Sequence, residues 1–266
     1  SVNNFIERVY KEIKSEKKYV KFGLSPFGIW RPGYPASIEG YDQYDKLYAD
    51  AKLWLNKGWI DYFTPQLYWK VNQYPQSFPV LLAWWQSENK KGRHLWPGMN
   101  VGLGGDDKNV DEIINQIMIT RGITPESVGA VHWSIAALVK HELMRKGLIE
   151  GPYKKDAIVP SSPWLDDKKP DRPIVTVAPV EGKLRIYLNH PETQDVFKWV
   201  VYLKYNNKWT YKVLNRKDKS FDVPGGGSFP ASEIAARTLQ AYAVTAIDRT
   251  GNESEFHEHT VGGIGY

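Results

Sequence analysis

The chain has 266 residues, 42% of them hydrophobic and 24% charged, with a formal net charge of +5 and no cysteine. This composition is that of a globular protein with room for one or two domains, and it excludes disulfides and thiolate chemistry. No apolar run reaches the roughly 18 residues of a membrane span. The lysines lie in scattered pairs rather than a basic stripe, which argues against a nucleic-acid partner.

The first 150 residues alternate between helical and strand patterns. Residues 2–16 predict a helix with one apolar stripe, and residues 20–24 predict a short strand that ends at Ser25. The later predicted elements continue this alternation: a helix over 43–57, a strand over 59–68, a helix over 77–91, a strand over 94–101, a helix from about 110, a strand over 128–134 and a short helix to 147. Such alternation indicates βαβ units and a parallel sheet.

Four strand–helix units are half of the eight that a closed (β/α)8 barrel needs. Four parallel strands alone leave both sheet edges open and one face bare. We therefore expect either a small open sheet or half of a barrel, and a half barrel predicts a bare inner face. We expect these residues on that face: Leu24, Phe63, Pro65, Leu67, Met99 and Val131.

The second part of the chain has a different pattern. Residues 151–172 are rich in proline and paired charges, which predicts a linker or a segment lying on a domain surface. From residue 173 to 266 the hydrophobic period is two, with turn-rich joints between short strands, which is typical of a β-sandwich. We predict three regions: a partial barrel over 1–150, the proline-rich segment over 151–172 and an immunoglobulin-like sandwich over 173–266.

Three segments carry a resemblance to a known family. Residues 22–31 (FGLSPFGIWR) closely resemble a signature of the glycosyl hydrolase-like 10 family, and residues 40–50 (GYDQYDKLYAD) and 54–69 (WLNKGWIDYFTPQLYW) resemble its next loop, helix and strand. The likeness continues more weakly to residue 150. Residues 242–254 (YAVTAIDRTGNES) resemble the closing hairpin of a fibronectin type III domain.

The family resemblance implies a bacterial TIM-barrel hydrolase of glycan strands, including peptidoglycan glycan stripped of peptides. It makes the present strands the fifth to eighth of the barrel. The family's Asp-Asp-Tyr motif at the end of the fourth strand is absent, so we expect the main catalytic acids in a missing N-terminal half. The chain begins at Ser1 rather than at an initiator Met, so we expect any address signal to lie in the missing part. The resemblance nevertheless implies an extracytoplasmic place: periplasm, cell surface (as a lipoprotein) or secreted.

Glycoside cleavage usually needs two carboxyl groups about 5–10 Å apart, and a barrel presents them at the carboxyl ends of its strands. The strand ends of this chain carry no carboxylate. The nearest acids follow the first strand, and Asp45 is the candidate catalytic residue, with helix capping as its alternative role. We expect Asp50 in mid-helix, Asp61 at the amino end of a strand, and Asp106 and Asp107 as caps.

The candidate substrate-binding residues are polar and aromatic side chains at the strand ends and in the first loop: Trp30, Arg31, Gln66, Tyr68, Trp69, Asn100, Trp133 and Ser134. Arg31 could hold a carboxylate or form a salt bridge within its loop. Gln66 and Asn100 could bind sugar hydroxyls or join a buried network. Each aromatic ring could stack on a sugar or pack in the core.

We predict part of a glycoside hydrolase that acts on a bacterial cell-wall or related polysaccharide by carboxylate acid/base chemistry, without metal or cofactor, and is inactive alone. The alternative is a non-catalytic glycan-binding envelope protein. The sandwich could also be a spacer or a protein-contact module. The expected partners are the polysaccharide and either the missing barrel half or a second copy of the chain, with no nucleic acid and no membrane span.

Overall fold

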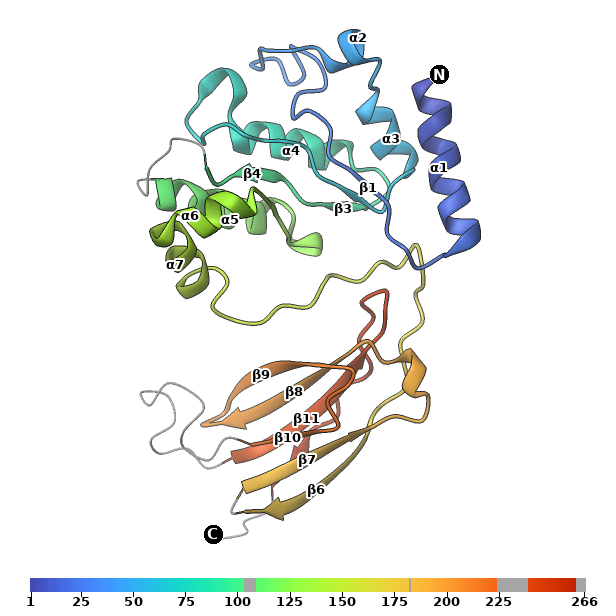
Figure 1. Cartoon of the computed structure of the whole chain (residues 1–266), viewed down its shortest axis with the longest axis vertical. Coiled ribbons are helices and arrows are strands. Elements are labelled where there is room, and N and C mark those ends of the chain that lie inside the picture. The colour runs from blue at the N-terminus through green and yellow to red at the C-terminus, as the bar shows by residue number, and fades with distance from the viewer. Residues whose placement is uncertain (103–108, 182, 224–238, 262–266) are drawn as a thin grey trace. The chain divides into compact units, whose positions relative to one another are not determined.

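The computed structural model describes residues 1–102, 109–181, 183–223 and 239–261. The chain divides into two compact units, Ser1–Lys155 and Asp156–Tyr266 (Figure 1). The first unit mixes helices with parallel strands, whereas the second is built from antiparallel strands. Over these described ranges, no helix is both long and apolar enough to cross a membrane.

The strands of the first unit are short and all parallel. They are β1 (Gly23–Leu24), β2 (Tyr62–Phe63), β3 (His94–Leu95), β4 (Gly98–Asn100) and β5 (Val131–Trp133). β2 pairs with β1 and β3, and β4 pairs with β5. Single bridges from Gln66 to Phe27 and to Gly98 join the two parts. Since β3 and β4 are pieces of one strand, the sheet holds four strands in chain order, and the predicted parallel sheet is confirmed.

Helices cover one face of this sheet. They are α1 (Val2–Glu16), α2 (Gln43–Leu47), α3 (Ala51–Lys57), α4 (Phe78–Glu88), α5 (Val110–Ile123), α6 (Ile135–Lys140) and α7 (Glu142–Glu150), with single 3-10 turns η1 (Tyr74–Gln76) and η3 (Pro125–Ser127). α1 has the predicted bounds and is capped by Ser1, whose hydroxyl accepts from the backbone N–H of Asn4 at 3.4 Å. The Trp54 indole N–H donates to Asn3 at 2.7 Å and so ties α1 to α3.

The helix predicted over 43–57 is two helices. Tyr48 ends α2 with a left-handed φ of 54°, and the Asp50 carboxylate accepts from the backbone N–H of Leu53 and caps α3. The expectation that Asp50 lies in mid-helix was therefore wrong. Aspartate competes with helix continuation by bonding the backbone locally, which favours a cap over an interior position.

The expected inner face was largely wrong. Phe63, Leu67 and Met99 are fully buried in the core between sheet and helices, where the Phe63 ring lies 4.8 Å from that of Trp85. Alternate strand residues point to opposite faces, so an error of one residue in parity moves the whole set. Of the six residues predicted for the inner face, Val131 in β5 is the exposed one, at 42%.

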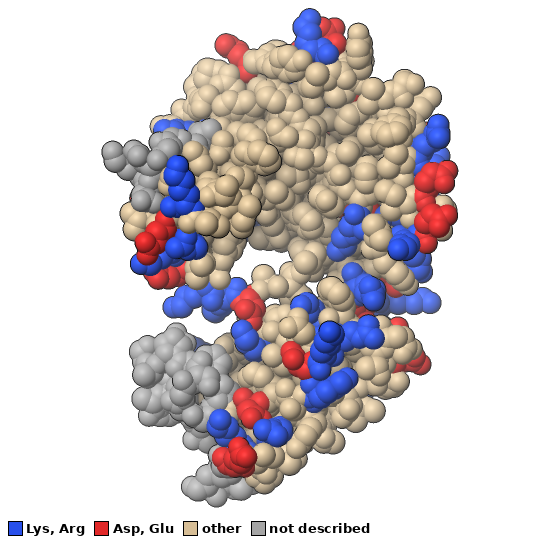
Figure 2. Space-filling model, viewed as in Figure 1, with Lys and Arg blue, Asp and Glu red and all other residues tan. Residues whose placement is uncertain are grey.

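The face away from the helices carries aromatic rings. Tyr62 stacks on Trp96 with centroids 5.3 Å apart, and His94 stacks on the same ring at 4.9 Å. A Cβ atom on Gly129 would lie 2.5 Å from the Trp96 ring, and one on Gly23 would lie 2.2 Å from the Tyr62 ring. Glycine is required at both positions because the rings fill the space of a side chain. Figure 2 shows charged side chains mainly at the margins of this unit, with few on the face turned to the viewer.

The second unit is a β-sandwich. Its strands are β6 (Ile174–Val180), β7 (Lys183–Asn189), β8 (Lys198–Tyr205), β9 (Lys208–Asn215), β10 (Ser220–Asp222), β11 (Leu239–Ile247) and β12 (His259–Thr260), with a 3-10 turn η4 (Thr193–Asp195). They form antiparallel sheets in the orders β10-β7-β6 and β12-β11-β8-β9. Both sheets contribute to one core, with Ile186 from the first and Trp199 and Val244 from the second. The period-two pattern thus predicted the architecture correctly.

The proline-rich stretch beyond residue 155 lies on the sandwich. The backbone N–H of Ser162 donates to the Thr250 carbonyl at 2.8 Å, and Asn252 donates to the carbonyl of Asp166 at 2.9 Å. Ser162 is fully buried. These contacts fix the stretch against the turn that follows β11.

Candidate functional site

The carboxyl ends of the four parallel strands form one rim of the first unit. Ser25 follows β1, Gln66 follows β2, and Asn100 and Trp133 end β4 and β5 as direct partners in the register. In parallel α/β sheets this edge is where loops build ligand sites. The structure therefore brings these predicted residues to one place, which we call the rim.

Gln66 takes part in a polar network at the centre of the rim. Its side-chain amide donates to the Ser25 carbonyl at 2.9 Å and lies 3.4 Å from the Ser25 hydroxyl. These solvent-exposed bonds tie Gln66 to the end of the neighbouring strand, and its role in sugar binding stays a prediction. The first loop approaches closely here, because a Cβ on Gly28 would lie 2.3 Å from the Gln66 carbonyl.

Tyr68, Trp69 and Asn100 line one small cavity beside the rim, together with residues of α5. The Asn100 side-chain oxygen accepts from the backbone N–H of Gly102 at 3.0 Å. Burial raises the pKa of the Tyr68 phenol, so this group is a neutral hydrogen-bonding group at physiological pH. The Trp69 ring packs edge-on against Phe27 at 5.5 Å, so one of its faces has a packing role.

Glu112 is a rim residue that the sequence reasoning missed. It lies in the first turn of α5 and is the one carboxylate among the described residues that line this cavity. Its Oε1 accepts from the backbone N–H of Val71 at 2.7 Å and from Gln116 at 2.9 Å. Gln116 is 3% exposed, and its Oε1 has no hydrogen-bond partner among the described residues. The signal was available, since the first turn of a helix after a parallel strand returns to the rim.

Trp133 is the most accessible aromatic residue of the rim, with 61% of its surface exposed. Ser134 stands at the N-cap position of α6, where its carbonyl accepts from Ala137. His132 points to the opposite face, where its Nε2 lies 2.6 Å from the Tyr153 hydroxyl. Burial lowers the pKa of His132, so the ring is neutral at pH 7.

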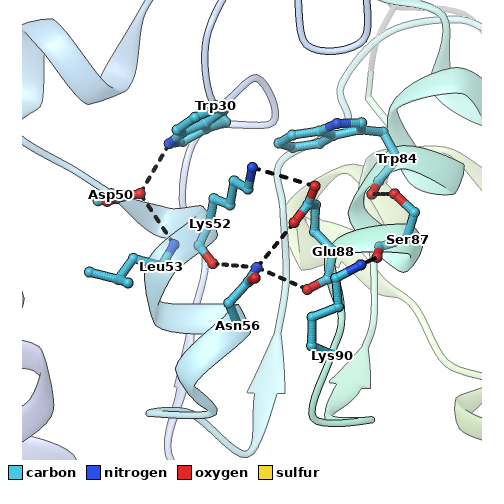
Figure 3. A network of polar contacts seen from close by, with 9 residues as sticks. All are labelled: Trp30, Asp50, Lys52, Leu53, Asn56, Trp84, Ser87, Glu88 and Lys90. Atoms are coloured by element: carbon cyan, nitrogen blue, oxygen red, sulfur yellow. Dashed lines mark hydrogen bonds and ion pairs between the residues drawn. The ribbon is translucent and has the colours of Figure 1, made fainter.

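Trp30 and Arg31 contact residues of the helices and their caps rather than the strand ends. Figure 3 shows Trp30 between Asp50 and Trp84. The Trp30 ring stacks on Trp84 of α4 at 6.0 Å, and its indole N–H donates to Asp50 at 3.2 Å. The Arg31 guanidinium donates to Asp42 at 3.0 Å. Of the two roles considered for Arg31, the loop salt bridge is the one present.

The acids of the first loop have separate positions. Asp42 caps α2 by accepting from the backbone N–H of Asp45 at 2.9 Å. Burial alone would raise the pKa of Asp42, but this bond and Arg31 outweigh it and lower the pKa. The Asp45 carboxylate is 59% exposed and pairs with Lys46 at 2.8 Å. Asp42, and not Asp45, therefore caps α2. No contact among the described residues supports the predicted catalytic role of Asp45. Asp106 and Asp107 lie outside the described residues.

Among the residues that the structure describes, no group of three or more His, Asp or Glu side chains is placed to hold a metal ion. The rim instead offers amides, a phenol and the exposed ring of Trp133. Such groups bind uncharged hydroxylated ligands by hydrogen bonds and stacking.

Comparison with known proteins confirms the family resemblance for the first part of the chain. Residues 1–103 match the family model described as glycosyl hydrolase-like 10. The chain is 31% identical to the glycosyl hydrolase YngK of Bacillus subtilis over 98% of its own length. It is 35% identical to the glycosyl hydrolase DigH of Escherichia coli K12 over 42% of its length. The chain spans only 53% of the first relative and 26% of the second.

Two solved structures are also similar. A fibronectin type III domain of human collagen XX matches 35% of the chain and 91% of that domain's chain, with 14% identity and a TM-score of 0.25. The spore cortex lytic enzyme SleM of Clostridium perfringens matches 82% of this chain and 85% of its own, with 12% identity and a TM-score of 0.28.

Proposed function

We propose that the first unit is the C-terminal half of a (β/α)8 barrel in a glycoside hydrolase that acts on a bacterial cell-wall glycan or a related polysaccharide. The observation that carries the proposal is the sheet: four parallel strands in chain order, helices on one face, and a rim that gathers Gln66, Tyr68, Asn100 and Trp133. The relatives named glycosyl hydrolases support the reaction class.

The edges of the first unit support a partial barrel. Exposed apolar side chains gather on α1 (Val2 at 39% and Phe5 at 63%) and on α6 (Ile135 at 74% and Val139 at 70%). These helices lie on opposite sides of the unit (Figure 1). Apolar surface of this kind marks a face that another element covers, and in a closed barrel both sides would contact the other four strand–helix units.

The catalytic acids of this proposal come from outside the present residues. Glu112, the carboxylate among the described residues that line the rim cavity, is held by two hydrogen bonds. Asp45 lies on α2, where it is paired in solvent with Lys46. We propose that the present half supplies sugar-binding groups, with Trp133 as an exposed platform. A cell-wall substrate also supports an extracytoplasmic place of action.

The test compares the 266-residue chain with a longer protein that carries four further strand–helix units before Ser1. Both are incubated with glycan strands stripped of peptide, and the reducing ends released are measured. We expect hydrolysis only by the longer protein and not by the 266-residue chain. Trp133→Ala in the longer protein should lower its affinity for the substrate. Hydrolysis by the 266-residue chain would overturn the assignment of the acids.

A non-catalytic glycan-binding protein is the second candidate, and the lack of an uncommitted carboxylate at the described rim favours it. Its discriminating result is glycan binding by the longer protein without any release of reducing ends.

A further inference from the structure

Four aromatic rings from the loop after β1, from α2 and from α4 form a cluster outside the rim. Trp30 lies at its centre, stacked on Trp84 at 6.0 Å, with Tyr34 and Tyr44 edge-on at 5.0 Å and 5.8 Å. Tyr34 is 47% exposed and Tyr44 is 40% exposed. We call Trp30, Tyr34, Tyr44 and Trp84 the outer aromatic surface.

Charged groups hold these rings in place. The Trp30 indole is bonded to Asp50, which also caps α3, and the ammonium of Lys52 lies 4.7 Å above the same ring (Figure 3). The Arg31 guanidinium lies 4.8 Å from the Tyr44 ring while it bonds Asp42. Since the rings are fixed before any ligand arrives, binding loses little side-chain entropy.

A second row of rings leads from the rim toward the same loop. Trp69 at the rim packs edge-on against Phe27 at 5.5 Å, and Phe27 packs edge-on against Tyr41 at 5.7 Å. Tyr41 is itself 46% exposed. The loop after β1 therefore carries an exposed tyrosine, Tyr41, at the end of a row of rings that begins at Trp69 of the rim.

The chemistry of the outer aromatic surface suits a neutral sugar chain. Aromatic faces and edges pack on the C–H faces of sugars, and phenol hydroxyls exchange hydrogen bonds with sugar hydroxyls. The flanking cations are already neutralised, because Arg31 pairs with Asp42 and Lys52 pairs with Glu88 at 3.5 Å. A strongly charged partner would find little unpaired charge there.

We propose that the outer aromatic surface binds sugar units of a long glycan beyond those held at the rim. The inference rests on the proposed function and deepens it, because it makes the preferred substrate a polymer rather than a short oligosaccharide. A long glycan that contacts both the rim and the outer aromatic surface binds more tightly than one that contacts either alone. A short oligosaccharide gains no such affinity, because it cannot reach both.

The experiment measures binding of two probes to the 266-residue chain: short β-1,4-linked N-acetylglucosamine oligosaccharides and long glycan strands stripped of peptide. Tyr34→Ala/Tyr44→Ala removes the exposed rings, and Tyr34→Phe/Tyr44→Phe keeps them. The matched control is Tyr19→Ala/Tyr74→Ala, which removes two exposed tyrosines, 42% and 76% exposed, from elsewhere on the same unit. Tryptophan fluorescence verifies the fold of each variant.

We expect the alanine pair to weaken binding of the long strands by about tenfold, or about 1.4 kcal/mol shared between two rings. The phenylalanine pair and the control should retain most of the affinity for the long strands. All variants should bind the short probe as tightly as the unchanged chain does. Unchanged binding of the long glycan by the alanine pair would contradict this inference but not the proposed function. An equal loss of affinity for both probes would have the same meaning. Failure of the unchanged chain to bind either probe would sink both.

Discussion

Asp61 offers the sharpest test of how the first unit is held together. Its side chain is fully buried at the amino end of β2 and accepts from the Phe22 backbone N–H at 2.7 Å, from the Tyr10 hydroxyl at 3.2 Å and from the Lys14 ammonium. These partners belong to α1 and to the residue before β1. Asp61→Asn keeps the size of the side chain, removes its charge and turns one acceptor into a donor that faces donors.

Breaking a buried ion pair costs about 3–5 kcal/mol when the remaining charge stays buried. The Lys14 side chain is 17% exposed and also donates to the Val20 carbonyl, so it recovers part of its solvation. We therefore expect a loss of about 3 kcal/mol, which is a large share of the roughly 5–15 kcal/mol that stabilises a domain. With a urea m-value of about 2 kcal/mol per molar, the midpoint falls by about 1.5 M.

Urea unfolding followed by tryptophan fluorescence measures this change, because eight of the eleven tryptophans lie in the first unit. The matched control is Asp45→Asn, the same substitution in an exposed pair with Lys46. An exposed pair contributes about 0.5 kcal/mol or less. A loss at Asp61 of under about 1 kcal/mol, or one equal to the control, would refute the reasoning.

Three further predictions follow from the same unit. Gly129→Ala forces a methyl group to within 2.5 Å of a tryptophan ring and should cost about 1–3 kcal/mol of unfolding free energy in urea, whereas Gly122→Ala, with open space around it, should be neutral or stabilising. Burial lowers the pKa of His132 in the folded chain below the ordinary histidine pKa of about 6.5, so the free energy of unfolding should fall as the pH drops below about 6.5. His132→Gln should flatten this pH dependence between pH 7 and 5. Ile135→Lys/Val139→Glu should reduce self-association in light scattering without lowering the unfolding midpoint; unchanged association would show that this exposed edge is not what associates.

Local patterns in the sequence predicted the elements better than their packing. The stripe of α1 and the alternation of β7 each identify an element from its own residues. The break between α2 and α3 was missed because it depends on one aspartate cap, which a continuous apolar pattern hides. The face of the sheet occupied by Phe63 was also missed, since a period of two gives alternation but not which side the helices cover.

The rim was largely predictable, and the first loop was not. A residue that ends a parallel strand must lie at the carboxyl edge, which placed Gln66, Asn100 and Trp133 together without any knowledge of contacts. Trp30 and Arg31 follow a strand by only a few residues, but their loop folds back over α3 and α4. That path depends on bonds to Asp50 and Asp42, which are distant enough in the sequence that spacing alone does not indicate them.

The two open edges of the sheet also distinguish the partners that could close it. In a pair of identical chains, the free edge of β5 in each copy would meet the free edge of β1 in the other, and such a closed two-fold contact would bury the apolar side chains of α1 and α6. The doubled rim would then hold two sets of Gln66 and Asn100. Glu112 of each copy would still accept hydrogen bonds from Val71 and Gln116 of its own chain. As far as the described residues go, only different strand–helix units would bring new carboxylates to the rim. A dimer of this chain should therefore bind glycan without cleaving it, whereas cleavage should accompany closure by units of another sequence.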